Sequence, residues 1–429
     1  MTAFPFLSSY DPPGTSEGTL DPLGLYQIAD QLAVQLVPAV RERMQRVRFL
    51  TAMAVGALVT EGIDDDVRQR DASPYLVWEW LIIEAFIQEM GDSDGLAGTP
   101  GTLVARRALG QHGYLDARSY LKTPRIFGFH GVYKRLAIHL GLVDVHLRAG
   151  PNAEPLVNAW ARDRGLSGYQ DAQSLLSQWA AVVRGCLAEA PPRTKLGRAA
   201  ATKLAEAFAP GAAGFREKRC LRELLKAEDD RRLGALPVLW QLQSELGDDE
   251  FCEELLHDEL ERREPVYGQL LRAIRAYEKF ARSLQDAFDV LKAVAATSDG
   301  QGSALNAVAR DPEFKQSMTG LHERFEQAHR ALGEVGFAKL SLQNLFHTRF
   351  IAFADPLSAG DCAAALCDHH VAVQRGKSAD GKRPWFDRIG RDRIYIRLAY
   401  RQPRRAIQPD RYVHDYRGWP IRRFHGDLT

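Results

Sequence analysis

Apolar residues recur at intervals of three and four positions along most of the 429-residue chain, a spacing that predicts amphipathic helices. The first run covers residues 25–61, where Ile28, Leu32 and Leu36 lie one helical turn apart. The dipeptide Ser73-Pro74 predicts the start of an aromatic helix, because serine is a favoured N-cap and proline suits the first helical position. Further helices are predicted over residues 172–190, 196–208, 215–227, 249–263, 266–296, 314–337 and 359–373. The pattern therefore predicts a mainly α, multi-domain protein.

The periodicity changes at the C-terminal end of the chain. Between residues 393 and 400 (RIYIRLAY), Ile394, Ile396 and Leu398 alternate with polar or aromatic residues, which predicts a β-strand. Residues 412–414 (YVH) are predicted to form the returning strand. Since no fixed repeat of about 20–50 residues is present, a solenoid is not predicted. We expect an N-terminal helical region over residues 1–100, a separate module over 101–170, a helical bundle over 171–357 and a small basic α+β element over 358–429.

Charge is unevenly distributed along the chain, although the formal net charge is only +1. Counting Lys and Arg against Asp and Glu, residues 1–100 carry −9 and residues 171–370 carry −5. Residues 101–170 carry +6, and residues 371–429 carry +9. Two basic blocks in an otherwise acidic chain indicate a polyanionic partner.

Cysteine usage and hydropathy predict a cytoplasmic protein. The five cysteines show no CxxC spacing, which is typical of a reducing compartment rather than of a disulfide framework. The first residues, MTAFPFLSSYDPPG, lack the basic and apolar regions of a signal peptide. The most apolar stretch, residues 75–90, contains Glu79, Glu84 and Glu89 and is too short to span a bilayer. We therefore expect no membrane partner.

Residues 101–164 show the order of elements of a compact trihelical module. Helices are predicted over residues 101–109, 115–122 and 132–140, and Gly141 suits the position after the third helix. A short strand at 142–144, a turn and an apolar helix that contains Trp160 follow. This order, with the sequence LGLVD after the third helix, resembles the winged-helix group. The resemblance implies that the third helix lies in the major groove of DNA and that the following strand begins the wing.

Basic and aromatic residues in and before the third predicted helix are candidate DNA contacts. Lys and Arg side chains bind phosphate, and Tyr and His side chains add hydrogen bonds to phosphate or base edges. The candidates in this module are Arg118, Lys122, Arg125, His130, Tyr133, Lys134 and Arg135. Because few residues separate Val145 from Pro151, the wing is short, and phosphate contact is expected to outweigh base reading. The alternative is that the module packs within the protein or binds another protein.

The C-terminal block interleaves basic residues with aromatic ones, a composition typical of nucleic-acid-binding surfaces. Over residues 371–429, Arg outnumbers Lys by 13 to 2, and arginine both binds phosphate through two hydrogen bonds and stacks on rings. The candidate contacts are Lys382, Arg383, Arg388, Arg391, Arg393, Arg397, Arg404 and Arg405. The alternative is that these arginines pair with the acidic surface of the rest of the chain.

Sequence motifs predict neither a cofactor nor catalytic residues. The chain contains no phosphate-binding loop of the form GxxxxGK followed by Ser or Thr, no dinucleotide-binding fingerprint and no HExxH pair. The cluster from Cys362 to His370 contains two cysteines and two histidines, which are zinc-binding residue types. One continuous helix cannot direct all four to one ion, so buried thiols are expected instead. Asp387 and Asp392 lie near the predicted strand without the D/E-x-K sequence of a nuclease.

The sequence GKRPWFDRIGRDRIYIR at residues 381–397, together with the helical scaffold and the winged-helix-like module, resembles bacterial proteins of the kind encoded in phage-defence clusters. The resemblance implies membership of a multi-protein system. The leading hypothesis is a non-catalytic DNA-binding or DNA-sensing subunit that acts with protein partners. The alternatives are a structural adaptor that docks an acidic protein partner, and a divergent metal-dependent nuclease that uses Asp387, Asp392 and His370.

Overall fold

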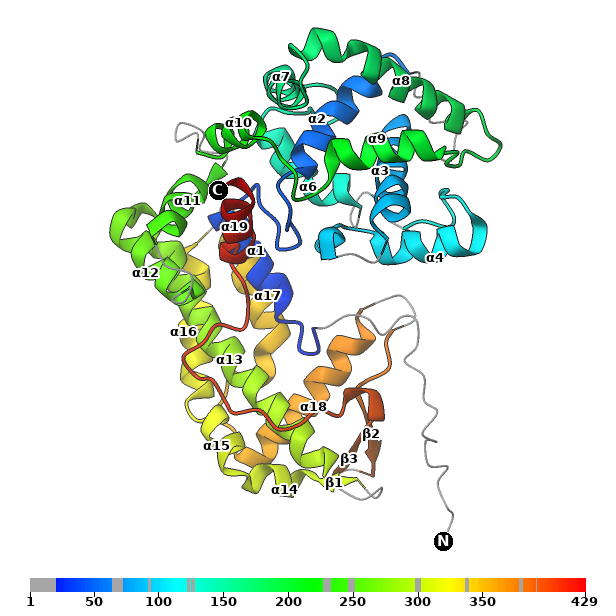
Figure 1. Ribbon diagram of the computed structural model, residues 1–429. Coiled ribbons are helices and arrows are strands. Elements are labelled where there is room, and N and C mark those ends of the chain that lie inside the picture. The colour runs from blue at the N-terminus through cyan, green and yellow to red at the C-terminus, as the bar shows by residue number, and fades with distance from the viewer. Residues whose placement is uncertain are drawn as a thin grey trace. The chain divides into compact units, whose positions relative to one another are not determined.

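The computed structural model describes residues 21–63, 72–91, 94–121, 124, 128–226, 233–245, 251–297, 302–335, 339–377, 381–390 and 392–429. It confirms a mainly α protein with a small antiparallel sheet near the C-terminal end (Figure 1). The chain forms two compact units. Unit 1 combines Met1–Leu36 with Cys252–Tyr416, and unit 2 combines Val37–Phe251 with Arg417–Thr429. These units cut across the four predicted regions, because each unit joins segments that are far apart in the sequence.

Unit 1 is built around α13, which spans Gly268–Ala296. Apolar residues at three and four spacing run along the helix and are buried, among them Leu271, Phe280 and Phe288. α13 packs against helices from both segments of the unit. The other helices are α1 (Tyr26–Leu36), α12 (Glu253–Arg263), α14 (Leu305–Arg310), α15 (Pro312–Met318), α16 (Leu321–Glu334), α17 (Lys339–Phe350) and α18 (Ala359–Arg375), with single 3-10 turns at Pro265–Tyr267, Ile351–Phe353 and Leu398–Tyr400.

Three short strands of unit 1 pair in the order β1–β3–β2, and both pairings are antiparallel. β3 spans Arg393–Ile396, so the strand predicted over 393–400 is confirmed in its first half. Its partners are β2, Phe386–Ile389, which precedes it along the chain, and β1, Ser303–Ala304. The buried residues of β3 alternate with partly exposed ones, as expected for a strand that covers a core on one face.

Residues 412–414 form no strand, so the predicted returning strand is wrong. The backbone N–H groups of Tyr412 and Val413 instead donate to the carboxylates of Glu254 and Glu278. Each backbone N–H group can be satisfied by a side chain as well as by a neighbouring strand. These two carboxylates therefore accept the backbone N–H groups that would otherwise bond to a neighbouring strand.

Unit 2 has a core of packed tryptophan and phenylalanine rings. Trp160 and Phe208 stack with ring centroids 5.7 Å apart, and Trp78 and Trp179 pack against the same phenylalanine at 5.7 and 5.6 Å. These four rings join α3, α7, α8 and α9. The helices of the unit are α2 (Phe49–Val59), α3 (Pro74–Met90), α4 (Thr102–His112), α6 (Phe129–His139), α7 (Ala153–Asp163), α8 (Tyr169–Leu187), α9 (Arg198–Phe208), α10 (Phe215–Leu225), α11 (Leu236–Glu245) and α19 (Gly418–Leu428), with a 3-10 turn at Asp94–Leu96.

The aromatic helix α3 begins where the sequence predicts. Ser73 Oγ accepts a hydrogen bond from the backbone N–H of Leu76 at 3.3 Å, and Pro74 occupies the first turn. Gly56 of α2 permits a close approach to this helix, because a Cβ atom at Gly56 would lie only 2.4 Å from Trp78 Cδ1. None of the helices among the described residues, α3 included, is long and apolar enough to cross a membrane.

Two predicted helices are each divided in the structure. The run over residues 25–61 forms α1 and α2, and Pro38, which has no N–H group to continue a helix, follows the end of α1. The run over 314–337 forms α15 and α16. Gly320 stands between them with φ of +71°, a backbone conformation that glycine adopts more readily than other residues.

Candidate functional site

The winged-helix-like segment lies within unit 2 and shows part of the predicted order. α4, α6 and α7 occupy the places of the first, third and last predicted helices. Between α6 and α7 the chain turns back, and Val143 pairs with Ala149 in an isolated antiparallel bridge. The described part of the helix predicted over 115–122 is a turn, so that helix is wrong. Asp116 Oδ1 accepts hydrogen bonds from two backbone N–H groups that follow it, which closes the turn.

α6, to which the resemblance assigns the major groove, is largely buried. Tyr133 is buried, and its hydroxyl accepts hydrogen bonds from the backbone N–H groups of Gln45 and Arg46 at 2.9 and 2.8 Å. Burial raises the pKa of Tyr133, so its hydroxyl stays neutral. His130 is also buried, and its Nδ1 bonds to the carboxylate of Glu79. The side chains of His130 and Tyr133, both predicted DNA contacts, are therefore bonded inside unit 2 and are not presented to solvent.

The other candidates in this segment are not gathered on one open face. Lys134 and Arg135 are partly exposed and donate to backbone carbonyl groups of unit 2 at 2.6 and 3.4 Å. Arg118 is exposed on the turn after α4. Lys122 and Arg125 lie outside the described residues. The partly exposed cations of α6 thus already donate hydrogen bonds to backbone carbonyl groups.

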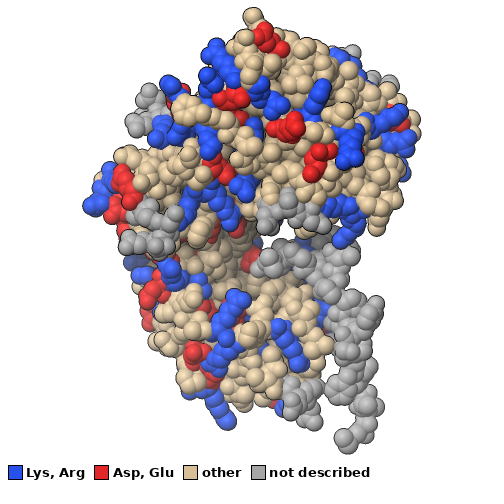
Figure 2. All heavy atoms as spheres, viewed as in Figure 1, with Lys and Arg blue, Asp and Glu red and all other residues tan. Residues whose placement is uncertain are grey.

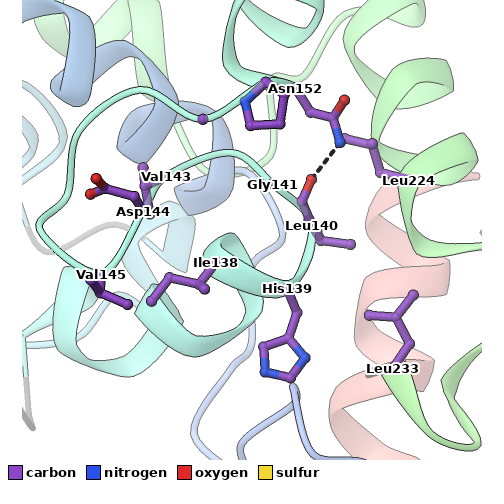
Figure 3. A pocket seen from close by; sticks show the side chains of 12 residues that line it. Ile138, His139, Leu140, Gly141, Val143, Asp144, Val145, Asn152, Leu224 and Leu233 are labelled. Carbon is purple, nitrogen blue, oxygen red and sulfur yellow. Dashed lines mark hydrogen bonds between the residues drawn. The ribbon is translucent and has the colours of Figure 1, made fainter. Parts of the chain in front are cut away.

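A pocket of about 430 Å³ lies where α6 ends (Figure 3). Most of its lining is apolar and comes from α6, the bridged turn and α10, as with Ile138 and Leu224. Asn152 Nδ2 donates to the carbonyl of Leu140 at 2.8 Å and closes one wall. Burial opposes the ionisation of Asp144, but hydrogen bonds from two backbone N–H groups of its turn outweigh it and lower the pKa of Asp144. The lining contains no Ser, Thr, Cys or Lys, and its polar side chains are those of His139, Asp144 and Asn152.

α10 carries an exposed basic surface that the charge of long segments does not reveal. Glu217, Leu221 and Leu225 are buried at intervals of four residues. The helix and the residue that follows it place these exposed or partly exposed cations between the buried positions: Arg216, Lys218, Arg219, Arg222 and Lys226. Glu223, with a side chain 65% exposed, is the exposed carboxylate of this helix, and it pairs with Arg219 at 2.8 Å.

Neighbouring helices extend this surface. Near the end of α7, Asp163 accepts a hydrogen bond from the backbone N–H of Glu217 at 2.8 Å, so this end lies beside the first turn of α10. Arg162 and Arg164 flank Asp163 and are exposed. α19 also packs against α10 and carries the exposed Arg423. We define the α10 face as the side chains of Arg162, Arg164, Arg216, Lys218, Arg219, Arg222, Lys226 and Arg423.

Acidic side chains beside the α10 face are mostly buried and paired. Asp163, Glu217 and Asp427 each form an ion pair with an arginine and are little exposed. Within the part of the chain that the structure describes, Lys218 and Arg222 form no ion pair. Figure 2 shows Lys and Arg side chains over the region of α7 and α10. Among the described residues, the α10 face therefore carries more exposed cations than exposed carboxylates.

The basic side of α10 can be recognised in the sequence when charge is examined over a single helix. Phe215, Arg219, Arg222 and Lys226 lie at i, i+4, i+7 and i+11, which places them on one side of a helix. The sum of charge over residues 171–370 is negative and conceals this stripe. The charge would have to be counted over one helix, and by the side of that helix, rather than over a whole domain.

Several arginines of the C-terminal block pair with acidic side chains of unit 1. The pairs are Arg404 with Asp311 and Glu313, Arg388 with Asp368, Arg383 with Asp387 and Arg411 with Glu254. The guanidinium of Arg404 lies 2.8 Å from Asp311 and donates to both carboxylates. These pairs support the alternative in which the block docks on acidic residues of the same chain.

The remaining candidates of the block have mixed surroundings. Arg397, a predicted DNA contact, is only 2% exposed and donates to a backbone carbonyl at 3.4 Å, so it is not presented to solvent. Arg393 is partly exposed and donates to a backbone carbonyl beside β1. Lys382 is partly exposed and Arg405 is exposed, whereas Arg391 lies outside the described residues. The block does not present its cations together in the way its composition predicts.

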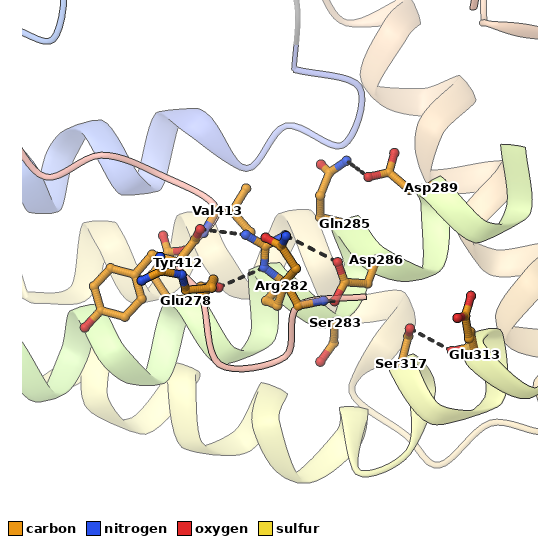
Figure 4. A network of polar contacts seen from close by, with 12 residues as sticks. Glu278, Arg282, Ser283, Gln285, Asp286, Asp289, Glu313, Ser317, Tyr412 and Val413 are labelled. Atoms are coloured by element: carbon orange, nitrogen blue, oxygen red, sulfur yellow. Dashed lines mark hydrogen bonds and ion pairs between the residues drawn. The ribbon is translucent and has the colours of Figure 1, made fainter. Parts of the chain in front are cut away.

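Residues 401–416, here called the C-terminal strap, contain no helix or strand and are held to α13 by polar side chains (Figure 4). Arg282 donates to two carbonyl groups of the strap at 2.8 and 2.6 Å. Glu278 accepts hydrogen bonds from the hydroxyl of Tyr416 at 2.6 Å and from Nδ1 of His414 at 2.7 Å. Asp286 accepts another from a backbone N–H at 3.2 Å. These bonds satisfy a segment that has no secondary structure of its own.

The cysteine and histidine cluster of α18 belongs to the interior of unit 1. Cys362 and Cys367 are buried as predicted, and burial raises the pKa of these thiols to about 11 and about 12. His369 Nε2 and His370 Nδ1 bond to backbone carbonyl groups at 2.8 and 2.9 Å, and His370 Nε2 accepts a backbone N–H at 3.0 Å. Asp387 pairs with Arg383, so two of the three residues considered for a nuclease, Asp387 and His370, are engaged elsewhere, whereas Asp392 is exposed.

His257 is a buried titratable group beside the strap. Its ring centroid lies 5.5 Å from that of Tyr412 and 5.6 Å from that of Tyr416. Its Nε2 lies 3.5 Å from Glu253 Oε2, and neither ring nitrogen has a hydrogen-bond partner among the described residues. Burial, assisted by the charge of Arg275, lowers the pKa of His257 to about 3. The native state therefore holds this histidine neutral.

The substitution His257→Phe is expected to make unit 1 less sensitive to acid. The unfolded chain protonates this histidine near its ordinary pKa of 6.5, so stability present at neutral pH is lost as pH falls from there toward about 3. The loss is up to about 1.4 kcal/mol per pH unit. Phenylalanine fills the same space and binds no proton, so this component disappears. Urea denaturation at about pH 7 and about pH 5 measures the difference.

His146→Phe provides the matched control, because His146 is an exposed histidine of unit 2. This control should keep the pH dependence of the wild type. If His257→Phe also loses as much stability between the two pH values as the wild type does, the buried neutral histidine is not a source of the acid sensitivity.

Among the described residues, no group of three or more His, Cys, Asp or Glu side chains is arranged to hold a metal ion. The α10 face presents exposed cations on three adjoining helices, an arrangement that suits a polyanion. A comparison of the chain with protein-family models, with curated proteins and with solved structures finds no match.

Proposed function

We propose that this protein is a non-catalytic DNA-binding or DNA-sensing subunit that holds duplex phosphates on the α10 face. The observation that carries the proposal is the imbalance of charge on α10 and the residue after it, where five exposed or partly exposed cations accompany one exposed carboxylate, Glu223. Lys and Arg contacts with phosphate supply most of the affinity in sequence-independent DNA binding, because they release counterions. α7 comes from the winged-helix-like segment and adds Arg162 and Arg164 to the same face.

The dimensions of α10 fit a phosphate-binding surface. The helix has 11 residues, and at a rise of 1.5 Å per residue this corresponds to about 16 Å. Duplex DNA carries one negative charge per about 1.7 Å of its axis, so a helix of this length spans several phosphates. Such contacts position a duplex without reading its bases. The turn between Val143 and Ala149, which stands where a wing is expected, is short and offers little surface for reading bases.

Reversal of three charges of the α10 face is expected to remove most of the DNA binding. In the triple variant Arg219→Glu, Arg222→Glu and Lys226→Glu, three cations become repulsive toward phosphate. We expect the affinity for a blunt duplex at low salt to fall by about tenfold or more, and the slope of log affinity against log salt to decrease by about 3. Fluorescence anisotropy with labelled duplex over a salt titration measures both quantities.

Two matched variants locate the effect. The triple variant Arg184→Glu, Arg198→Glu and Lys203→Glu makes the same change of charge at exposed positions of α8 and α9, and it should bind nearly as the wild type does. Equal losses in both triple variants would show that only net charge matters. Absence of binding by the wild type at low salt would refute the proposal. Loss of binding in Lys134→Glu with Arg135→Glu, but not in the α10 variant, would place the contact on α6 instead.

A further inference from the structure

Trp419 differs from the other tryptophans of the chain in being accessible. All seven tryptophans lie in the described residues, and Trp419 is 45% exposed whereas the other six are at most 8% exposed. A tryptophan side chain carries a large apolar area and is usually buried or placed at an interface. The exposed indole of Trp419 is therefore a candidate contact surface.

The indole is supported from within unit 2. Its centroid lies 4.6 Å from that of Phe251 with an interplanar angle of 68°. The guanidinium of Arg422 lies 4.7 Å from the ring centroid of Phe251 and 5.6 Å from that of Trp419. Ring and cation contacts of this kind reduce the freedom of the side chain. Trp419 is thus held in place while part of its surface remains open.

Trp419 continues the α10 face along α19. Residues 419, 423 and 426 are exposed at i, i+4 and i+7, whereas Ile421, Phe424 and Leu428 are buried on the opposite side. Arg423 belongs to the α10 face, and Trp419 lies one turn away along the same side of the helix, a distance of about 6 Å. A chain of phosphates bound on the α10 face therefore brings its bases close to an open aromatic ring.

The ring suits an unpaired base rather than a base pair. Inside a duplex, both faces of each base are covered by neighbouring base pairs. An unpaired base has an open face, and stacking on an aromatic side chain contributes about 1–3 kcal/mol per base without regard to sequence. The positive charge of the exposed Arg423 and of the rest of the α10 face favours a polyanion as the molecule that carries this base.

We propose that Trp419 is a stacking platform for an unpaired nucleobase, and that the preferred ligand is duplex DNA with a short single-stranded segment. The inference rests on the proposed DNA binding by the α10 face and adds the class of DNA. In this arrangement the cations hold the duplex phosphates, and a base beyond the end of the duplex stacks on the indole.

The test compares a blunt duplex with the same duplex carrying a short 3′ or 5′ overhang, using the full chain and its tryptophan fluorescence. We expect one overhang duplex to bind about 5- to 100-fold more tightly than the blunt duplex. Trp419→Ala should remove this preference and leave the affinity for the blunt duplex within about twofold. Trp419→Phe keeps an aromatic face, so it should retain most of the preference but lose the quenching of fluorescence that overhang DNA causes.

Leu103→Ala is the control for removal of an exposed apolar side chain, because Leu103 is strongly exposed on α4. This variant should retain the preference. Equal binding of blunt and overhang DNA by the wild type, or equal losses for both ligands in Trp419→Ala, would overturn the stacking proposal. Salt-dependent binding of the blunt duplex that the α10 variant abolishes would then leave the proposed function standing. A wild type that binds none of these DNAs would overturn both proposals.

Discussion

Replacement of Glu278 by leucine is expected to lower the free energy of unfolding by about 3–5 kcal/mol at neutral pH. The carboxylate of Glu278 is buried and accepts hydrogen bonds from the Tyr416 hydroxyl, from His414 Nδ1 and from the backbone N–H of Val413. Leucine restores apolar volume but accepts none of these bonds. The donors would then be buried without partners, which is the costly part of the change.

The same carboxylate makes the strap sensitive to strong acid. Burial opposes the ionisation of Glu278, but the charge and hydrogen bond of His414, with the other donors, outweigh it and lower the pKa of Glu278. A carboxyl group whose pKa is lower in the folded state contributes stability above the unfolded pKa of about 4.3. That contribution is lost as pH falls through the folded pKa. Below about pH 4 the wild type should therefore approach the Leu variant in stability.

Chemical denaturation and limited trypsin digestion together test the role of Glu278. The strap contains Arg404, Arg405 and Arg411, so its release from α13 should speed trypsin cleavage at these positions. Lys279→Ala, at the neighbouring exposed position of α13, should change stability by no more than about 0.5 kcal/mol. A Glu278→Leu protein with wild-type stability and a protected strap would show that the strap is anchored by other contacts.

Replacement of Arg48 by methionine is expected to destabilise unit 2 by a similar amount, about 3–5 kcal/mol. Arg48 Nη2 pairs with Glu217 at 3.1 Å, and both side chains are buried. Glu217 also accepts a hydrogen bond from Thr51 Oγ1 at 2.7 Å. Methionine fills much of the space of the arginine, but it leaves the carboxylate buried without a counter-charge. The double variant Arg48→Met with Glu217→Leu should recover at least half of the loss, because it removes the unpaired charge.

The pH dependence of Arg48→Met distinguishes this mechanism from a simple packing defect. Burial raises the pKa of Glu217 even with Arg48 beside it, and removal of the cation raises it further. A carboxyl group whose pKa is raised in the folded state binds its proton more tightly there, so stability increases as pH falls. Arg48→Met should thus regain stability relative to the wild type between about pH 8 and about pH 5. Denaturation curves at the two pH values measure this gain.

Arg184→Met, at an exposed position of α8, is the control for loss of an arginine. It should match the wild type at both pH values. A difference between Arg48→Met and the wild type that does not vary with pH would mean that the change acts through packing and not through the charge of Glu217.

Local sequence was sufficient for most helices. The spacing that predicts residues 266–296 corresponds to α13 to within two residues at its start, and Ser73 caps α3 as its chemistry suggests. These features depend on residues only a few positions apart. The charge pattern also identified basic regions, but it was summed over segments too long to reveal the stripe on α10.

The candidate site could not be predicted in the same way. In the sequence, His130 and Tyr133 are indistinguishable from polar residues on an exposed recognition helix. In the structure, Glu79 binds His130, and the backbone at Gln45 binds Tyr133, so both lie in the interior. Arg397 is a similar case. The alternation of apolar and polar residues around it predicts an exposed side chain, but in the structure it is buried.

The sequence by itself determined the mainly helical class, the positions of the principal helices and the presence of surplus basic charge in particular segments. Only the tertiary structure decided which cations face solvent. Arg404 is neutralised by Asp311 and Arg48 by Glu217, whereas Arg222 on α10 forms no ion pair with a described residue. The physical reason is that helix formation depends on neighbours along the chain, whereas burial and ion pairing depend on residues that the fold brings together from distant positions.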